Sequence, residues 1–205
     1  MNPPASTAPT FAIGALPPDD DAALDAAARL LTAAFAAHWP GAWATFAAAR
    51  AEVDEALAPD RICRAAFAAD GRVLGWIGGN AQYAGCVWEL HPLAVHPDAQ
   101  QQGVGRALMA DFEQQVAARG GVTILLGTDD EASMTTLGAV DLYPNVWEHI
   151  AGVRNLRRHP FEFYQKCGFV IVGVVPDANG LGKPDILMAK RVGGNSPSPE
   201  SETSR

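Results

Sequence analysis

A glycine-containing turn in the middle of the chain joins a strand pattern to a helix pattern. The turn is the segment QQQGVGRAL, residues 100–108, and it follows an apolar run that ends before Pro97. Apolar side chains then recur at helical spacing at Val104, Leu108, Phe112 and Val116. The amides of a helix N-terminus bind anions, and glycine lets an anion approach the backbone closely. The unit therefore predicts a turn that binds pyrophosphate, although an ordinary flexible loop fits the same residues.

Two other phosphate-binding motifs do not fit this turn. The dinucleotide fingerprint needs a third glycine and a downstream acid that binds ribose, and neither stands at the expected spacing. A P-loop needs a lysine followed by serine or threonine, and no such pair follows Gly105. A pyrophosphate site here would therefore belong to another class of loop.

Strand and helix patterns are mixed along the chain and predict one α/β or α+β domain. Strands are expected over residues 11–16, 86–95, 120–128, 170–175 and 185–192, with a hairpin over 61–83 that turns at Asp70-Gly71. Helices are expected over residues 17–35, 43–57, 103–118, 145–156 and 159–168. The domain is expected to span residues 11–192, between a disordered N-terminus (1–10) and a disordered, low-complexity tail (193–205).

The composition limits the classes of partner. The chain has 205 residues and a formal net charge of −8. Such a charge repels nucleic acid and attracts a cationic small molecule, although it also serves solubility alone. No apolar run approaches the roughly 20 residues of a membrane helix, and the N-terminus lacks the pattern of a signal peptide. We therefore expect no nucleic-acid and no membrane partner.

Cysteines and histidines do not suggest a metal site. The three cysteines, at positions 63, 86 and 167, show no ligand spacing, and the five histidines are dispersed. Unpaired, scattered cysteines are typical of reduced thiols in a cytoplasmic protein. We therefore expect a cytoplasmic chain that holds no metal.

A second segment, FYQKCGF at residues 163–169, places Tyr164 in a short helix that Gly168 closes. Together with the glycine turn, it resembles the GNAT superfamily of N-acetyltransferases, in which an acetyl-CoA loop is followed by such a tyrosine segment. The chain looks most like the aminoglycoside 6′-N-acetyltransferases of that superfamily. The segments that carry this likeness are WELHPLAV, ARGGVTILLGTDD, TTLGAVDLYPN, RNLRRHPFEFYQKCGF and VIVGVVPDANGLGKPDILMAKR.

The resemblance implies direct acetyl transfer from acetyl-CoA to a primary amine. It implies a single domain with a mixed, mostly antiparallel sheet that is splayed at the acetyl-CoA strand and carries helices on both faces. The amide of Leu93 would face the thioester oxygen as an oxyanion donor, and the pantetheine arm would pair with the same strand. The implied cofactor-binding residues are Leu93, Ala94, Val95, Gln101, Gln102, Gly103, Val104, Gly105, Arg106, Asn155 and Tyr164.

Two side chains are candidates for proton transfer. Tyr164 would protonate the leaving thiolate, because a phenol pKa of about 10 is close to the thiol value of about 8.5. The alternative is a tyrosine that only packs in the core. Glu89 would orient the amine and accept its proton through water, because a carboxylate is a weak direct base for an ammonium; the alternative is a pair with a neighbouring cation. His91, two residues further on the same strand face, is expected to be structural.

An acidic surface is expected where a polycationic amine binds. Asp129, Asp130 and Glu131 follow a buried strand, where sites in such folds often lie, although Asp129 or Asp130 could instead cap a helix. Trp39 and Tyr83 lie in turn-like segments and would stack on sugar rings, unless they plug the core.

One position departs from the resembled family, since the acid that helps to hold the drug there aligns with Ala132 in this chain. The sequence therefore leaves three functions open. They are an aminoglycoside 6′-N-acetyltransferase that confers antibiotic resistance, an acetyltransferase for a polyamine, peptide or metabolite amine, and a CoA-binding module without catalysis. Members of the resembled family are often dimers, so a homodimer is expected, with the two late strands as its candidate interface.

Overall fold

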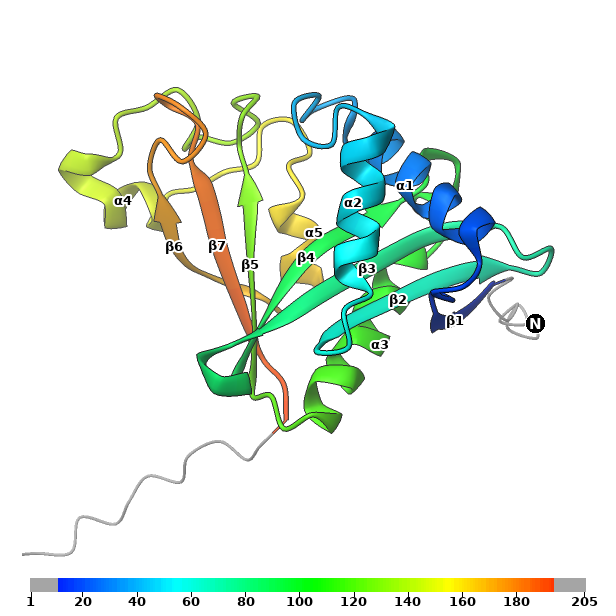
Figure 1. The fold of residues 1–205 in the computed structure, drawn as a ribbon. Helices are drawn as coiled ribbons and strands as arrows, with labels where there is room; N and C mark the ends of the chain where they lie inside the picture. The colour runs from blue at the N-terminus through cyan, green and yellow to red at the C-terminus, as the bar shows by residue number, and fades with distance from the viewer. Residues whose placement is uncertain (1–10, 194–205) are drawn as a thin grey trace, which may run out of the picture.

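The computed structural model describes residues 11–193 and contains one sheet of seven strands in the order β1-β2-β3-β4-β5-β7-β6 (Figure 1). Every neighbouring pair is antiparallel except β4 and β5, so the predicted mixed, mostly antiparallel sheet is confirmed. The strands are β1 (Phe11–Ala15), β2 (Arg61–Ala68), β3 (Val73–Gln82), β4 (Val87–Val95), β5 (Thr123–Asp129), β6 (Val170–Val175) and β7 (Asp185–Arg191). The helices are α1 (Asp21–Phe35), α2 (Phe46–Ala56), α3 (Val104–Ala118), α4 (Val146–Ala151) and α5 (Phe161–Lys166).

Helices cover both faces of the sheet, as predicted. α1 and α2 lie over β2–β4 on one face, and α3 lies on the other (Figure 1). Trp76 of β3 is fully buried beneath α1, where its indole N–H donates to the carbonyl of Ala27 at 3.2 Å. On the opposite face, Leu108 and Phe112 of α3 are fully buried in a second core. Two apolar cores therefore hold the central strands between layers of helix.

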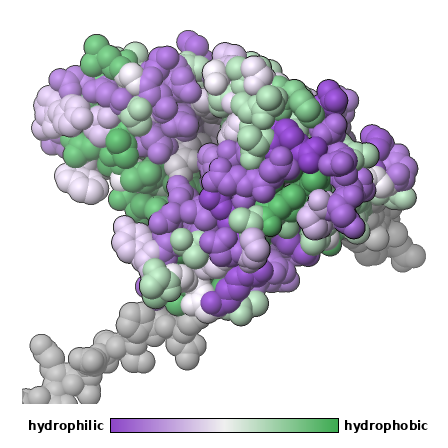
Figure 2. Space-filling view, viewed as in Figure 1, coloured by the Kyte–Doolittle hydropathy of each residue, from purple (hydrophilic) through white to green (hydrophobic). Residues whose placement is uncertain are grey.

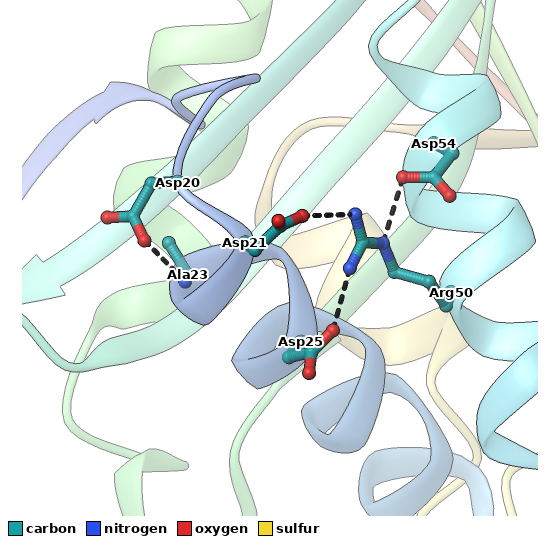
Figure 3. Close-up of polar contacts among 6 residues, drawn as sticks. All are labelled: Asp20, Asp21, Ala23, Asp25, Arg50 and Asp54. Atoms are coloured by element: carbon teal, nitrogen blue, oxygen red, sulfur yellow. Dashed lines mark hydrogen bonds and ion pairs between the residues drawn. The ribbon is translucent and has the colours of Figure 1, made fainter.

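An arginine joins the two helices of the first layer. Arg50 of α2 donates to Asp21 and Asp25 of α1 at 3.0 and 2.7 Å, and to Asp54 of its own helix at 2.9 Å (Figure 3). The hydrogen bonds to Asp54, Asp21 and Asp25 raise the pKa of Arg50. These contacts fix the angle at which α1 and α2 lie on the sheet.

β4 and β5 are paired at one end only. Their parallel ladder joins residues 87–89 of β4 to residues 123–125 of β5. Beyond Glu89 the two strands diverge, and β4 continues to Val95 without a strand partner on that side (Figure 1). The predicted splay is therefore confirmed, and it leaves backbone groups of β4 available to a ligand.

A bulge in the β3–β4 pair lies beside the splay. The register shifts next to Gly79. A Cβ on Gly78 would lie 2.5 Å from the carbonyl oxygen of His91, and one on Gly79 would lie 2.7 Å from that of Glu89, so only glycine permits this approach. The bulge changes the face that β4 residues occupy: His91 lies on the side of α1 and α2, whereas Leu93 packs against the core beneath α3.

Three interpretations of the sequence are wrong. The helix expected over residues 145–156 is α4, which ends at Ala151 and is followed by an irregular segment. α4 buries no residue fully, and so short a helix gains little stability without packing. No helix begins directly after β5, so neither Asp129 nor Asp130 caps one. The first helix is also shorter than expected, because Asp20 caps it and it begins at Asp21 rather than at residue 17.

The disorder predicted at the two ends lies outside the described residues, apart from Gly193, which forms a bend. Between residues 11 and 193, the helices are all too short or too polar to cross a membrane.

Candidate active site

The predicted pyrophosphate turn lies between β4 and α3. Gln101 and Gly103 have φ angles of 62° and 88°, and α3 begins at Val104 without a side-chain cap. Within the described residues, the amides of residues 101–106 donate no hydrogen bond to another segment. The first amides of a helix also have no acceptor inside it. The turn therefore presents unpaired N–H groups at a helix N-terminus, and this arrangement fits a diphosphate.

Polar side chains of the turn hold its shape. The side-chain amide of Gln102 donates to the carbonyl of Asp98 at 2.7 Å, and the side-chain amide of Gln100 donates to the carbonyl of Val95 at 3.3 Å. Arg106 is exposed at the start of α3. Burial raises the pKa of the thiol of Cys167, and the charge of Arg106 opposes this rise. Arg106 therefore lies near the end of α5, at the edge of the turn.

α5 brings the tyrosine to the same side of the sheet. A Cβ on Gly105 would lie 3.4 Å from the ring of Phe163, which packs edge-on against Tyr164 with 5.2 Å between ring centroids. Tyr164 and Leu93 both pack against the core beneath α3. Burial raises the pKa of Tyr164, so the phenol keeps its proton at neutral pH. The structure thus brings the turn next to α5, and Leu93 and Tyr164 pack against the same core.

Glu89 lies at the vertex of the splay, on the opposite face. It is the last residue of β4 that pairs with β5, where its partner is Leu125. The side-chain amide of Gln82 donates to one of its carboxylate oxygens at 3.1 Å. Among the described residues it forms no ion pair, so the alternative of a neighbouring cation is wrong for this part of the chain.

His91 lies one step along the same face in a small polar cluster. Its ring contacts Trp43 with 5.5 Å between centroids, and its Nε2 atom lies 3.7 Å from Glu52 of α2. The indole N–H of Trp43 donates to the same carboxylate at 3.1 Å. These contacts tie the α1–α2 layer to β4, as the structural role expected for His91 requires. Glu52 was not anticipated, because nothing in the alanine-rich helix marks it.

The backbone carbonyl of Asp129 joins three segments at the end of β5. The indole N–H of Trp39 donates to it at 3.1 Å, and Nε2 of His159 lies 3.0 Å away. Nδ1 of His159 accepts from the amide of Phe161, so Nε2 carries the proton, and burial lowers the pKa of this histidine. Trp39 is therefore half-buried and anchored, beside a cavity of about 120 Å³ within the α1–α2 loop.

Two predicted ligand-binding residues use their side chains for hydrogen bonds within their own loops. Asp130 is fully buried, and its carboxylate accepts from the amides of Met134 and Thr135 and from the hydroxyl of Thr135 at 2.6–2.8 Å. Asn155 exchanges hydrogen bonds with the backbone of His159 at 2.7 and 2.9 Å. The side chains of both residues thus form hydrogen bonds within the fold.

The remaining predicted substrate residues are accessible. The carboxylate of Asp129 accepts from the amide of Asn179 at 2.5 Å, and that of Glu131 lies 3.7 Å from the ammonium of Lys183. Tyr83 is 76 % exposed on the short turn between β3 and β4. The structure therefore brings Trp39 and Asp129 together, whereas Tyr83 stands apart on its turn.

Sequence reasoning did not single out Asp185, the first residue of β7. It lies opposite Asp129 in the β5–β7 ladder, and its Oδ1 atom is buried without a hydrogen-bond partner in the described chain. Burial, followed by the charge of Asp129, raises the pKa of Asp185 to about 6. The KPDI segment contributed to the resemblance, but no local pattern reveals an unpaired acid.

Comparison with known proteins decides the family. The chain matches the model of the acetyltransferase (GNAT) family over residues 24–144. The chain belongs to the GNAT family. It is also similar, at 39% identity, to the structure of an aminoglycoside 6′-N-acetyltransferase complexed with coenzyme A (TM-score 0.82) and to that of the aminoglycoside 6′-N-acetyltransferase from Enterococcus faecium (TM-score 0.80). Each likeness covers 90% of this chain and 99% of the other.

More distant structures support only the fold of this chain, and one search found no similar protein. The ribosomal-protein-S18-alanine N-acetyltransferase from Escherichia coli is 20% identical, with a TM-score of 0.59 over 91% of this chain and 97% of the other. The search of curated proteins found no match.

This GNAT member is an acetyl-CoA-dependent N-acetyltransferase. The unpaired amides of residues 101–106 and the unpaired side of β4 fit the pyrophosphate and the pantetheine arm of the coenzyme. Between residues 11 and 193, no group of three or more His, Cys, Asp or Glu side chains could hold a metal ion. The roles of the individual residues stay predictions.

Proposed function

We propose that this chain transfers the acetyl group of acetyl-CoA to the 6′-amino group of aminoglycosides and so confers resistance to them. The observation that carries the proposal is the 39% identity, over 90% of the chain, to aminoglycoside 6′-N-acetyltransferases. The position of Glu89 at the vertex of the splay supports it, because an amine that approaches from the α1–α2 side meets a carboxylate there.

On the cofactor side, the turn amides bind the pyrophosphate, and residues 93–95 of β4 pair with the pantetheine arm. The amide of Leu93 donates to the thioester oxygen and stabilises the negative charge that develops on it. Tyr164 donates its proton to the leaving thiolate. Burial raises the pKa of this phenol in the unliganded protein, so it is protonated at neutral pH but is a weaker acid than an exposed tyrosine.

On the amine side, Glu89 orients the 6′-amine and accepts its proton through water. Asp129 and Glu131 attract the other ammonium groups, and Trp39 and Tyr83 pack against sugar rings. Asp130 and Asn155 are left out of the ligand contacts, because their side chains are satisfied within their own loops.

Another class of amine substrate is retained as the alternative because of the residue at position 132. Ala132 stands where the resembled family places an acid that helps to hold the drug, and the neighbouring Glu131 lies 3.7 Å from Lys183. A weaker acidic surface at this point lowers the affinity expected for an aminoglycoside, so a polyamine or a peptide amine is retained as the alternative substrate.

A substrate panel tests the proposal. Purified protein is incubated with acetyl-CoA and with kanamycin, spermidine or a peptide amine, and the release of CoA thiol is followed. Kanamycin is expected to support release, with acetylation at the 6′-amine in the product. Release with spermidine or peptides alone would contradict the aminoglycoside assignment and favour the alternative.

The role of Glu89 is tested in the same assay. Glu89→Gln is expected to lower kcat/KM for kanamycin at least about tenfold, because it removes the proton acceptor. Glu148→Gln, on exposed α4, is the matched control and is expected to match the wild type. Equal rates for both variants would remove Glu89 from the mechanism.

We also propose that the chain forms a homodimer through β6. β6 is an edge strand, and Val170, Val172 and Val175 are 62%, 47% and 43% exposed on it. Figure 2 shows this hydrophobic region beside polar surface, and an exposed apolar edge is a natural pairing surface. Light scattering is expected to give the dimer mass for the wild type and the monomer mass for Val172→Lys. A monomeric wild type would contradict the proposal.

A further inference from the structure

The carboxylate of Asp185 occupies a space that the sheet leaves open for it. A Cβ on Gly127 of β5 would collide with both oxygens of this carboxylate. The side chain therefore lies over Gly127, on the face of β5 that also carries Asp129. Leu125 shares this face and pairs with Glu89 of β4, so the three acids face the same side, at and beside the splay.

One oxygen of this carboxylate has no partner in the described chain, although the backbone of Thr128 partly stabilises the ionised group. Its Oδ1 atom is buried and lacks a hydrogen-bond donor. No lysine or arginine among residues 11–193 forms an ion pair with Asp185, Asp129 or Glu89. A buried acceptor without a donor costs stability, and two neighbouring acids add repulsion. Such an arrangement calls for a positively charged donor from outside the chain.

We propose that Asp185 binds an ammonium group of the amine substrate through the oxygen that the fold leaves without a donor. The inference rests on the proposed acetyl transfer to an amine, and it adds a residue that selects polycationic substrates. The bound ammonium would satisfy Oδ1 and reduce the repulsion from Asp129 and Glu89. A cation with several N–H donors suits a buried carboxylate better than water does.

The inference predicts a defined pH dependence. Burial, then the charges of Asp129 and Glu89, raise the pKa of Asp185 to about 6, and a backbone hydrogen bond from Thr128 opposes this rise. Above pH 6 the carboxylate is ionised and binds the ammonium, and below pH 6 it becomes protonated and loses the charge. KM for the amine is therefore expected to rise as the pH falls through about 6. Bound amine is expected to lower the pKa of Asp185, because it stabilises the ionised form.

Asp185→Asn is the direct test, and Asp70→Asn is its control. Asp70 lies exposed in the β2–β3 turn, away from β7 in the sheet. Both variants replace one aspartate with asparagine and therefore change the net charge equally. With kanamycin and acetyl-CoA, Asp185→Asn is expected to raise KM for the amine about tenfold, to leave kcat within about twofold and to leave KM for acetyl-CoA unchanged. The rise in KM at low pH is expected to be lost in this variant, and Asp70→Asn is expected to behave as the wild type.

A structural role for Asp185 would give different results. The unliganded Asp185→Asn protein is expected to melt at the same temperature as the wild type or higher, because it lacks an unpaired buried charge, whereas a structural carboxylate would lower the melting temperature on removal. A measurement on the wild type avoids the variant altogether. The carboxyl carbon of Asp185 is titrated by NMR with and without saturating kanamycin, and an unchanged pKa in the saturated protein would overturn the inference.

The failures of the two proposals can be told apart. If kanamycin is acetylated with equal KM by the wild type and Asp185→Asn, the inference about Asp185 is wrong and the proposed function stands. If only spermidine or a peptide amine is acetylated, the aminoglycoside assignment is wrong, and the same comparison of variants with that amine then decides the role of Asp185.

Discussion

Single residues divide the proposed proton transfers between the two faces of the sheet. Tyr164 lies on the side of α3 and stays protonated, because burial raises its pKa. Glu89 lies on the side of α1 and α2, where the side-chain amide of Gln82 donates a hydrogen bond to it. In the proposed mechanism, the amine therefore loses its proton on one face and the thiolate gains one on the other.

Tyr164→Phe tests this division. The variant keeps the ring that packs between Phe163 and Phe169 but loses the hydroxyl. kcat is expected to fall about a hundredfold, and KM for acetyl-CoA is expected to change less than about twofold. Tyr143→Phe, at a 68% exposed position, is the control. Equal kcat values for the two variants would show that the tyrosine only packs in the core.

At the scale of secondary-structure elements, the splay between β4 and β5 lies beside a bulge in the β3–β4 pair. β4 pairs with β5 only up to Glu89, and the bulge beside Gly78 and Gly79 bends the same part of β4. These glycines let the two strands of the hairpin approach where any side chain would meet a carbonyl oxygen or the ring of Phe112. The position of Leu93 on the α3 side depends on this bulge.

Gly79→Ala is therefore expected to destabilise the protein by about 2–3 kcal/mol, because the added methyl group has no space. The matched control is Gly14→Ala in β1, where a Cβ would lie 3.6 Å from Phe67, an ordinary contact, and where a change within about 0.5 kcal/mol is expected. Urea unfolding of the two variants measures the difference. Equal stabilities would show that the hairpin relaxes around the methyl group.

The sequence predicts features that are encoded locally. The Asp70-Gly71 turn, the glycine turn before α3 and the short helix of Tyr164 all follow from residues adjacent in the chain. The mixed, mostly antiparallel sheet and its splay followed from family resemblance, since no single segment contains them.

Features that depend on tertiary pairing could not be predicted. Asp185 is unpaired only because the β5–β7 register sets it opposite Asp129 and over Gly127. Asp130 looked like a ligand residue, but its loop folds back to supply three donors to it. α4 is shorter than expected, and none of its side chains is fully buried in a core that would stabilise a longer helix.

The whole molecule separates two ligands of opposite charge. Glu52, Glu89, Asp129 and Asp185 lie on the side from which the amine would approach, and the chain carries a net charge of −8. The cofactor side offers unpaired amides and Arg106 instead. A polycationic amine and an anionic coenzyme are therefore each attracted by the side that the proposed mechanism assigns to them.

The salt dependence of KM tests whether the electrostatic field of the whole protein attracts the amine. Between about 20 mM and about 300 mM sodium chloride, the screening length falls from roughly 20 Å to roughly 6 Å. KM for a polycationic amine is expected to rise about threefold to tenfold over this range, because distant carboxylates no longer attract it. KM for acetyl-CoA is measured in the same series as a comparison and is expected to rise less, because the net negative charge of the chain opposes the local attraction of an anion. If KM for the amine stayed constant, its binding would depend on short-range contacts alone, and the net charge would serve only solubility.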